Sequence, residues 1–175
     1  MNISKHILSG LLGVAIMGLT CLAVASELKR IAILDFELND LAGITPTPQD
    51  ELERTASIAP LVRDALSKKG GYEIVSIDSQ EQMKANSGFG YLFDHPDEAA
   101  KLGHRFGADW VAVGRIHKPS FLFAYLKVHL VNVNSERWVG DYVVEVKGVA
   151  KQVTERGAAR LAEQIDQTLK QRRAP

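Results

Sequence analysis

Two apolar, β-branched segments, residues 30–37 and 107–115, constrain the fold of this chain more than any other feature. Each has the length of a strand, opens after a charged or glycine-containing break, and closes on a polar residue or a glycine. Helical patterns lie between the two segments. They therefore predict two buried strands of one sheet in an α/β arrangement.

The rest of the chain supplies further strands and helices around this pair. Segments bounded by turn residues predict strands at 29–36, 72–77, 107–115, 121–133 and 138–146. Apolar residues at helical spacing predict helices at 49–69, 79–83, 97–106 and 153–170. Residues 37–40 are polar and lead into a proline-rich loop. Pro60 is awkward inside the first helix, and implies either a kink or a helix that begins near Ser57.

The resulting order is β-α-β-α-α-β-β-β-α, in which helices and strands alternate first and an antiparallel meander follows. This order predicts an α+β fold of one domain, with a mixed α/β-type sheet and its helices mainly on one face.

The N-terminus has the pattern of a secretory signal peptide. Lys5 precedes an apolar stretch at 7–25, which ends in the small residues Ala23-Val24-Ala25. We expect residues 1–25 to be removed near Ala25, leaving one domain at 26–175 in the Gram-negative periplasm with no stable membrane span. The alternatives are an uncleaved anchor, because the stretch is nearly long enough to span a bilayer, and a lipoprotein modified at Cys21.

Composition excludes several classes of function. Basic and acidic side chains balance at 21 each, and no basic cluster indicates a nucleic-acid partner. Cys21 is the single cysteine, so the cleaved protein has no disulfide and no thiolate site. The glycine-bounded segments 88–90 and 103–107 match no phosphate or dinucleotide motif, and we expect no cofactor.

A catalytic set is not evident in the sequence. No Gly-x-Ser-x-Gly motif is present, and the carboxylates Asp35, Glu37 and Asp40 are more typical of a solvated strand end than of an acid/base group. An enzyme or metal-binding alternative centres on four potential ligands, Asp94, His95, Asp97 and His104. Asp97 is also well placed to cap the helix that it precedes.

The two strands of the meander carry aromatic residues on what the pleat predicts to be one face. Residue alternation places Leu122, Ala124 and Leu126 toward the core and leaves aromatic side chains on the other side. The last strand is expected to present Trp138 and Tyr142 together. Such a face is either covered by the chain itself, for instance by the loop at 88–95, or offered to a partner. The candidate partner-binding residues are Phe121, Phe123, Tyr125, His129, Trp138 and Tyr142.

Residues 31–36 (IAILDF) and 102–115 (LGHRFGADWVAVGR) resemble the recurrent segments of the TolB amino-terminal and CsgG-type domain superfamily. Those domains begin with an "IAVLDF"-like strand and carry an "lGkelGADyvvvG"-like junction. More narrowly, residues 36–40, 91–96 and 117–125 are similar to a family of short exported bacterial proteins of unknown function. No β-propeller and no pore-forming insertion accompanies the two segments, so the resemblance implies neither a TolB-like role nor a pore.

The resemblance implies a periplasmic interaction or scaffolding module of envelope assemblies. We therefore expect a non-enzymatic binding or adaptor domain, as a monomer or a homo-oligomer, that recognises an envelope protein or a glycan-associated partner. The surface for this partner would be the aromatic face of the sheet or an exposed edge.

Overall fold

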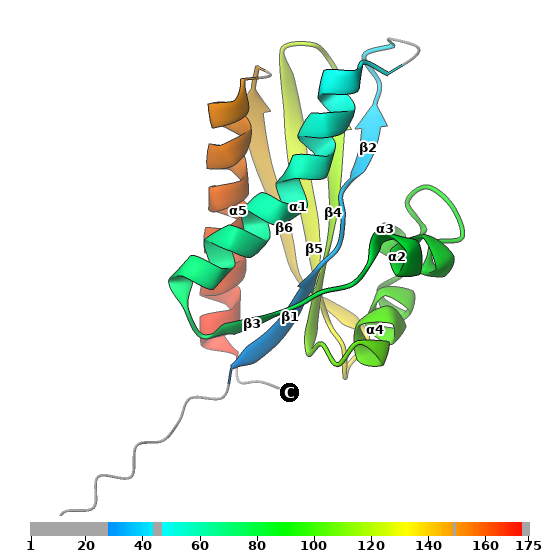
Figure 1. Ribbon diagram of the computed structural model, residues 1–175, viewed down its shortest axis with the longest axis vertical. Coiled ribbons are helices and arrows are strands. Elements are labelled where there is room, and N and C mark those ends of the chain that lie inside the picture. The colour runs from blue at the N-terminus through cyan, green and yellow to red at the C-terminus, as the bar shows by residue number, and fades with distance from the viewer. Residues whose placement is uncertain (1–27, 44–46, 149, 173–175) are drawn as a thin grey trace, which may run out of the picture.

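The computed structural model describes residues 28–43, 47–148 and 150–172 (Figure 1). The predicted signal peptide and Cys21 lie outside these residues. Six strands and five helices form in the described part. The strands are β1 Lys29–Ile33, β2 Glu37–Asp40, β3 Tyr72–Val75, β4 Trp110–Lys118, β5 Phe123–Asn132 and β6 Arg137–Lys147. The helices are α1 Gln49–Lys69, α2 Ser79–Ala85, α3 Tyr91–Asp94, α4 Pro96–Arg105 and α5 Lys151–Gln171.

The strands form one mixed sheet in the order β3-β1-β4-β5-β6, with β2 also paired to β4. The pairs of β1 with β3, β1 with β4 and β2 with β4 are parallel, whereas β4, β5 and β6 form an antiparallel meander. The predicted α+β domain with a mixed sheet is confirmed. The two segments that constrain the fold lie side by side in it, since Ile31 pairs with Trp110 and Ala32 with Val111.

The sheet has a different cover on each face. The long helices α1 and α5 pack on one face (Figure 1), where the buried cluster includes Ile58, Trp110, Leu126 and Leu161. The short helices α2 to α4 pack only on the lower part of the other face, around Leu34 and the other members of a smaller cluster. The upper part of that second face therefore stays without a helix in the described chain.

The polar residues 37–40, predicted to leave the sheet, instead form β2. The chain interrupts its pairing after Ile33 and then resumes along the second half of β4, with Glu37 opposite Arg115 and Asp40 opposite Lys118. Phe36 lies in the interruption and its ring covers the strand glycine Gly114. The prediction was wrong because all side chains of β2 except Leu38 are polar, while partners on β4 satisfy both its backbone and its carboxylates.

Leu122 and Asp97 do not take the positions predicted for them, whereas α1 keeps its predicted bounds. Helix α1 spans Gln49–Lys69 and continues through the exposed Pro60, so it does not begin near Ser57, which was one of the two alternatives for this proline. Leu122, expected in the core, is 76% exposed because it precedes β5 and lies in the β4–β5 connection. Helix α4 begins at Pro96, which places Asp97 inside the first turn and not at the cap.

Candidate interaction surface

The part of the second sheet face that the helices leave uncovered is the candidate interaction surface, here called the open face. Strand alternation and cross-strand register bring its side chains together from β4, β5 and β6. Its members are His117, Phe123, Tyr125, Lys127, His129, Trp138, Asp141, Val143 and Glu145. The open face thus combines aromatic, apolar and charged groups on one rigid sheet.

At its lower end the open face is bordered by a stack of rings. The imidazole of His129 stacks on Phe93 at 4.0 Å between centroids, and Trp138 lies 4.9 Å from the same imidazole. The Nδ1 atom of His129 lies 3.0 Å from the carbonyl oxygen of Phe93. His129 is therefore held between the α3 segment and β6, whereas Trp138 remains 49% exposed at the rim.

At its upper end the rings have less cover. Phe123 meets Tyr125 edge to face at 5.6 Å, and Tyr125 lies beside His117 at 6.4 Å. His117 is oriented by Asn39 of β2, whose Nδ2 lies 3.2 Å from the imidazole Nδ1. Paired rings with restricted rotamers lose little conformational entropy when a partner covers them.

Arg115 attaches the loop before α3 to the sheet. Its guanidinium lies over the rings of Phe89 and Phe93, 4.8 and 4.2 Å from their centroids. One nitrogen, Nη2, lies 3.2 Å from Oε2 of Glu37, whose carboxylate also accepts hydrogen bonds from Asn86 Nδ2 and the backbone N–H of Gly90. The loop at 88–95 therefore covers the lower half of the second face, as one of the two sequence alternatives predicted.

Gly90 is required at this contact. It has a φ of +82°, and a Cβ there would lie 2.5 Å from Arg115 Nη2. The close approach lets the Gly90 N–H reach the Glu37 carboxylate.

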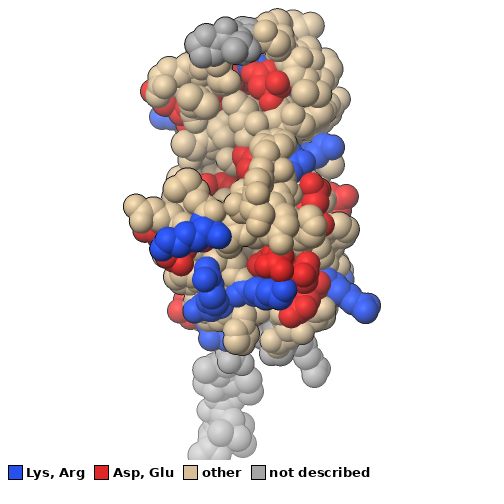
Figure 2. Space-filling view, turned by 90° about the vertical axis from the view of Figure 1, so that its right-hand side faces the viewer, with Lys and Arg blue, Asp and Glu red and all other residues tan. Residues whose placement is uncertain are grey.

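Charge is unevenly distributed around this region. Figure 2 shows the side of the molecule that carries α2 and α4, where Lys, Arg, Asp and Glu are most densely gathered in the lower part of the view. On α2 and α4, Lys84 pairs with Glu81 and Lys101 pairs with Glu98. Charges paired in this way give a solvated surface.

The aromatic residues proposed from sequence divide between several locations. Phe123, Tyr125, His129 and Trp138 lie together on the open face, and Phe121 lies in the β4–β5 connection, 57% exposed.

Tyr142 does not share a face with Trp138, so that part of the prediction is wrong. It is 8% exposed beneath α5, and its hydroxyl donates to Thr168 Oγ1 at 2.7 Å. A register shift near Leu130 reverses the alternation of β6 between Trp138 and Tyr142. Burial raises the pKa of the Tyr142 hydroxyl against the opposing effect of Thr168.

Three of the four potential metal ligands contact other side chains, and the fourth, His104, is exposed on α4. Asp94 lies 3.9 Å from Arg115, His95 stacks on Tyr91, and Asp97 pairs with Lys101 on α4. Among residues 28–43, 47–148 and 150–172, no three His, Cys, Asp or Glu side chains form a group that could hold a metal ion.

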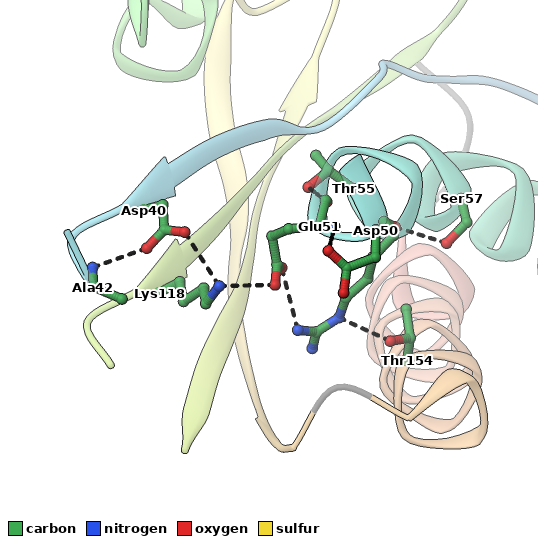
Figure 3. Close-up of polar contacts among 9 residues, drawn as sticks. Asp40, Ala42, Asp50, Glu51, Thr55, Ser57, Lys118 and Thr154 are labelled. Carbon is green, nitrogen blue, oxygen red and sulfur yellow. Dashed lines mark hydrogen bonds and ion pairs between the residues drawn. The ribbon is translucent and has the colours of Figure 1, made fainter. Parts of the chain in front are cut away.

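A buried cluster of charges closes the upper end of the fold, beneath the open face (Figure 3). Lys118 Nζ lies 2.8 Å from Glu51 Oε2 and 3.2 Å from Asp40 Oδ2. Arg54 contacts the other Glu51 oxygen at 3.3 Å and donates to Thr154 Oγ1 at 3.0 Å. Burial alone lowers the pKa of Lys118, but its hydrogen bonds to Glu51 and Asp40 outweigh that effect and raise it. The cluster joins β2, β4, α1 and α5, so its role is structural.

Sequence reasoning missed the buried contacts of both Arg115 and Lys118, although the strand pattern holds a signal for each. In β4, alternation from the buried Ile116 assigns Lys118 to the core face and Arg115 to the other face. A lysine on a core face predicts a buried acidic partner. It does not say which carboxylate that partner is, because Glu51 comes from a distant helix.

Most of the chain matches a known protein family. The DUF3280 family model, described as protein of unknown function (DUF2380), matches residues 29–165. The chain belongs to this family. A search of curated proteins gave no match.

Solved structures share the fold at low sequence identity. TolB from Acinetobacter baumannii is 16% identical, with a TM-score of 0.52 over 82% of this chain, which spans only 28% of that TolB chain. The PelC dodecamer from Paraburkholderia phytofirmans is 12% identical, with a TM-score of 0.51 over 81% of this chain and 91% of PelC. The LpoB C-terminal domain from Salmonella enterica is 15% identical, with a TM-score of 0.48 over 71% of this chain and 86% of that one.

The domain is therefore TolB-like in fold. Within the part of the chain that the structure describes, none of the helices has the length and apolar character needed to cross a bilayer.

Proposed function

We propose that this protein is a non-enzymatic binding module of the Gram-negative envelope, which recognises an envelope protein through the open face. The observation that carries the proposal is the row of rings along β5 and β6 that the fold leaves accessible. Phe123 and Tyr125 are half-buried on a rigid sheet, and Trp138 is exposed at its lower rim. Aromatic side chains and arginine are enriched at protein interfaces, and ordered rings are the usual centres of binding energy.

The same features favour a protein partner over a small-molecule substrate. The open face is a broad surface that mixes rings with Lys127, Asp141 and Glu145, whereas substrates of enzymes are held in concave pockets. A partner associated with envelope glycans fits the proposal equally, provided that the contact itself is made by protein.

We also propose that the protein is exported to the periplasm. The N-terminal pattern supports export, with cleavage near Ala25 and a periplasmic domain at 26–175, or with lipidation at Cys21 as the alternative. The TolB-like fold supports an envelope role, and a closer kinship to CsgG-type domains rests on the sequence motifs alone. PelC assembles as a dodecamer, which supports testing this chain for self-association.

A site-specific crosslinking experiment tests the open face. A photoreactive residue replaces Tyr125 in the full chain, and after irradiation in cells the crosslinked envelope proteins are identified by mass spectrometry. The matched control places the same group at Met83, which is exposed on α2 away from the open face. We expect a specific adduct from position 125 that position 83 does not give, and its loss in an F123A/W138A background.

Two outcomes would contradict binding through the open face. Equal adducts from both positions, or an adduct from position 125 that survives F123A/W138A, would place the partner elsewhere. Cell fractionation and the intact mass of the purified protein test the location, since cleavage at Ala25 gives a chain that begins at Ser26, and lipidation gives one that begins at a modified Cys21.

A further inference from the structure

Strand β6 leaves a long edge of the sheet unpaired. It runs for 11 residues, from Arg137 to Lys147, and pairs with β5 on one side. Over the described ranges no strand pairs with its other side. Proteins usually blunt such an edge, because its free N–H and C=O groups can accept another strand. The lower end of β6 is blunted by the register shift near Leu130 and by Arg172, whose Nη2 lies 3.4 Å from the carbonyl oxygen of Val139.

A groove follows this edge on the helical side of the sheet. It has a volume of about 670 Å³ and is lined by β6 from Val143 to Lys147 and by the outer side of α5. The α5 residues in the groove include Arg156, Arg160 and Glu163. No hydrogen bond or ion pair is seen for either arginine within the described residues. The groove therefore presents two unpaired cations beside an unpaired strand.

We propose that β6 pairs with β6 of a second copy of this chain, antiparallel and around a two-fold axis at Val144. In this register Asp141 of each copy lies opposite Lys147 of the other, and Val143 lies opposite Glu145. Directly opposed side chains of an antiparallel pair lie about 5 Å apart, so both Asp–Lys pairs are attractive. An axis at Val143 would instead oppose Asp141 to Glu145, and an axis at Glu145 would oppose two carboxylates.

The helices give independent support for the same axis. A Cβ at Gly157 would lie 2.7 Å from Val146, and Thr168 accepts the hydrogen bond of Tyr142. The middle of α5 must therefore lie beside Val144, because α5 runs opposite to β6 (Figure 1). A two-fold axis at that level aligns the two α5 helices antiparallel, with Arg160 of each copy near Glu163 of the other. The charges of the strands and of the helices thus favour one common axis.

This pairing joins the two sheets into one. Residues opposed in an antiparallel pair lie on the same face, so the two open faces lie on the same side of the dimer. The inference goes beyond the proposed function, since the dimer can form whether or not the open face binds a partner.

A charge-swap series tests the interface with exposed residues, since Asp141 and Lys147 are 71% and 81% exposed in their side chains. The oligomeric state of the purified full-chain product is measured by sedimentation over a range of concentrations. We expect a dimer for the wild type, an association weaker by about tenfold or more for D141K, because two attractive pairs become repulsive, and recovery in D141K/K147D. The matched control is K151D, which reverses a charge at the start of α5. A monomer at all concentrations, or a dimer that D141K leaves unchanged, would overturn the proposal.

Cysteine crosslinking tests the register. The V143C/E145C variant should form a covalent dimer under mild oxidation, since these positions oppose each other across the axis at Val144. The single variants report other registers, because V143C alone crosslinks only around an axis at residue 143 and E145C alone only around an axis at residue 145. A covalent dimer from either single variant at the yield of the double variant would overturn the register. A stable complex of monomer with an added extended peptide, without self-association, would replace the second copy by a peptide strand.

Discussion

Arg115 Nη2 lies 3.2 Å from Oε2 of Glu37, and this ion pair joins β4 to the unexpected strand β2. Both side chains are mostly buried, at 13% and 16% exposed. The same carboxylate receives the N–H of Gly90, so the pair also holds the loop before α3. One interaction thus sets the boundary between the covered and the open part of the second sheet face.

Loss of Arg115 should loosen that boundary without unfolding the domain. We expect R115A to cost about 3–5 kcal/mol, because it leaves the Glu37 carboxylate largely buried without its cation. Hydrogen exchange of the amides at 86–95 should accelerate, whereas that of α5 should not. R115A/E37Q is the control and should recover part of the loss in urea unfolding. Unchanged exchange at 86–95 would show that the loop is held by other contacts.

Lys118 should be required for stability and not for binding. We expect K118M to cost about 3–5 kcal/mol of unfolding free energy, because Glu51 and Asp40 are then buried without their shared partner. Neutralising those partners in K118M/E51Q/D40N should return much of the stability. Urea denaturation at neutral pH measures both effects. If K118M is as stable as the wild type, the cluster is more hydrated than the structure indicates.

Gly114 should resist enlargement because of the ring above it. A Cβ at this position would lie 2.4 Å from Phe36, a ring that is itself buried. We expect G114A to destabilise the protein by about 1–3 kcal/mol through overpacking. The double variant G114A/F36L should be more stable than the sum of the two single variants predicts, since the smaller side chain leaves room for the methyl group. Thermal unfolding of all four proteins measures this coupling.

Asp166 should make stability depend on acid pH. Burial raises its pKa, but its interactions with Lys170, Tyr72 and Lys69 outweigh burial and hold the pKa below the ordinary value. A carboxyl whose pKa is lowered by folding adds stability above its unfolded pKa of about 4, and loses it as the pH falls through the folded value.

We therefore expect D166N to cost about 1–3 kcal/mol at pH 7, and expect the difference from wild type to shrink below about pH 4. Urea unfolding of both proteins between pH 3 and pH 7 measures this. A difference that stays constant across the range would mean that the charge of Asp166 contributes nothing. The cost would then come from the hydrogen bond of Tyr72 alone.

The candidate site was only partly predictable from sequence. Alternation along β5 correctly grouped Phe123, Tyr125 and His129, because an uninterrupted strand keeps a period of two. The same rule failed for Trp138 and Tyr142, since a local register shift in β6 reverses their relation. Gly140 is a local signal for an irregularity, since a glycine inside a strand often marks a bulge, but the shift itself depends on how β6 fits against β5.

The sequence by itself determined that the two buried segments are strands of one sheet, that a meander follows and that the domain is α+β, because apolar periodicity and turn residues act over a few neighbours. Tertiary structure alone decided that Glu37–Asp40 forms a strand, that Arg115 and Lys118 find their carboxylates, and which rings remain accessible. The physical reason is that a polar side chain is buried only where a partner satisfies it, and the local sequence does not reveal that partner. The position of such a side chain depends on partners such as Glu37 and Glu51, which only the folded chain brings within reach.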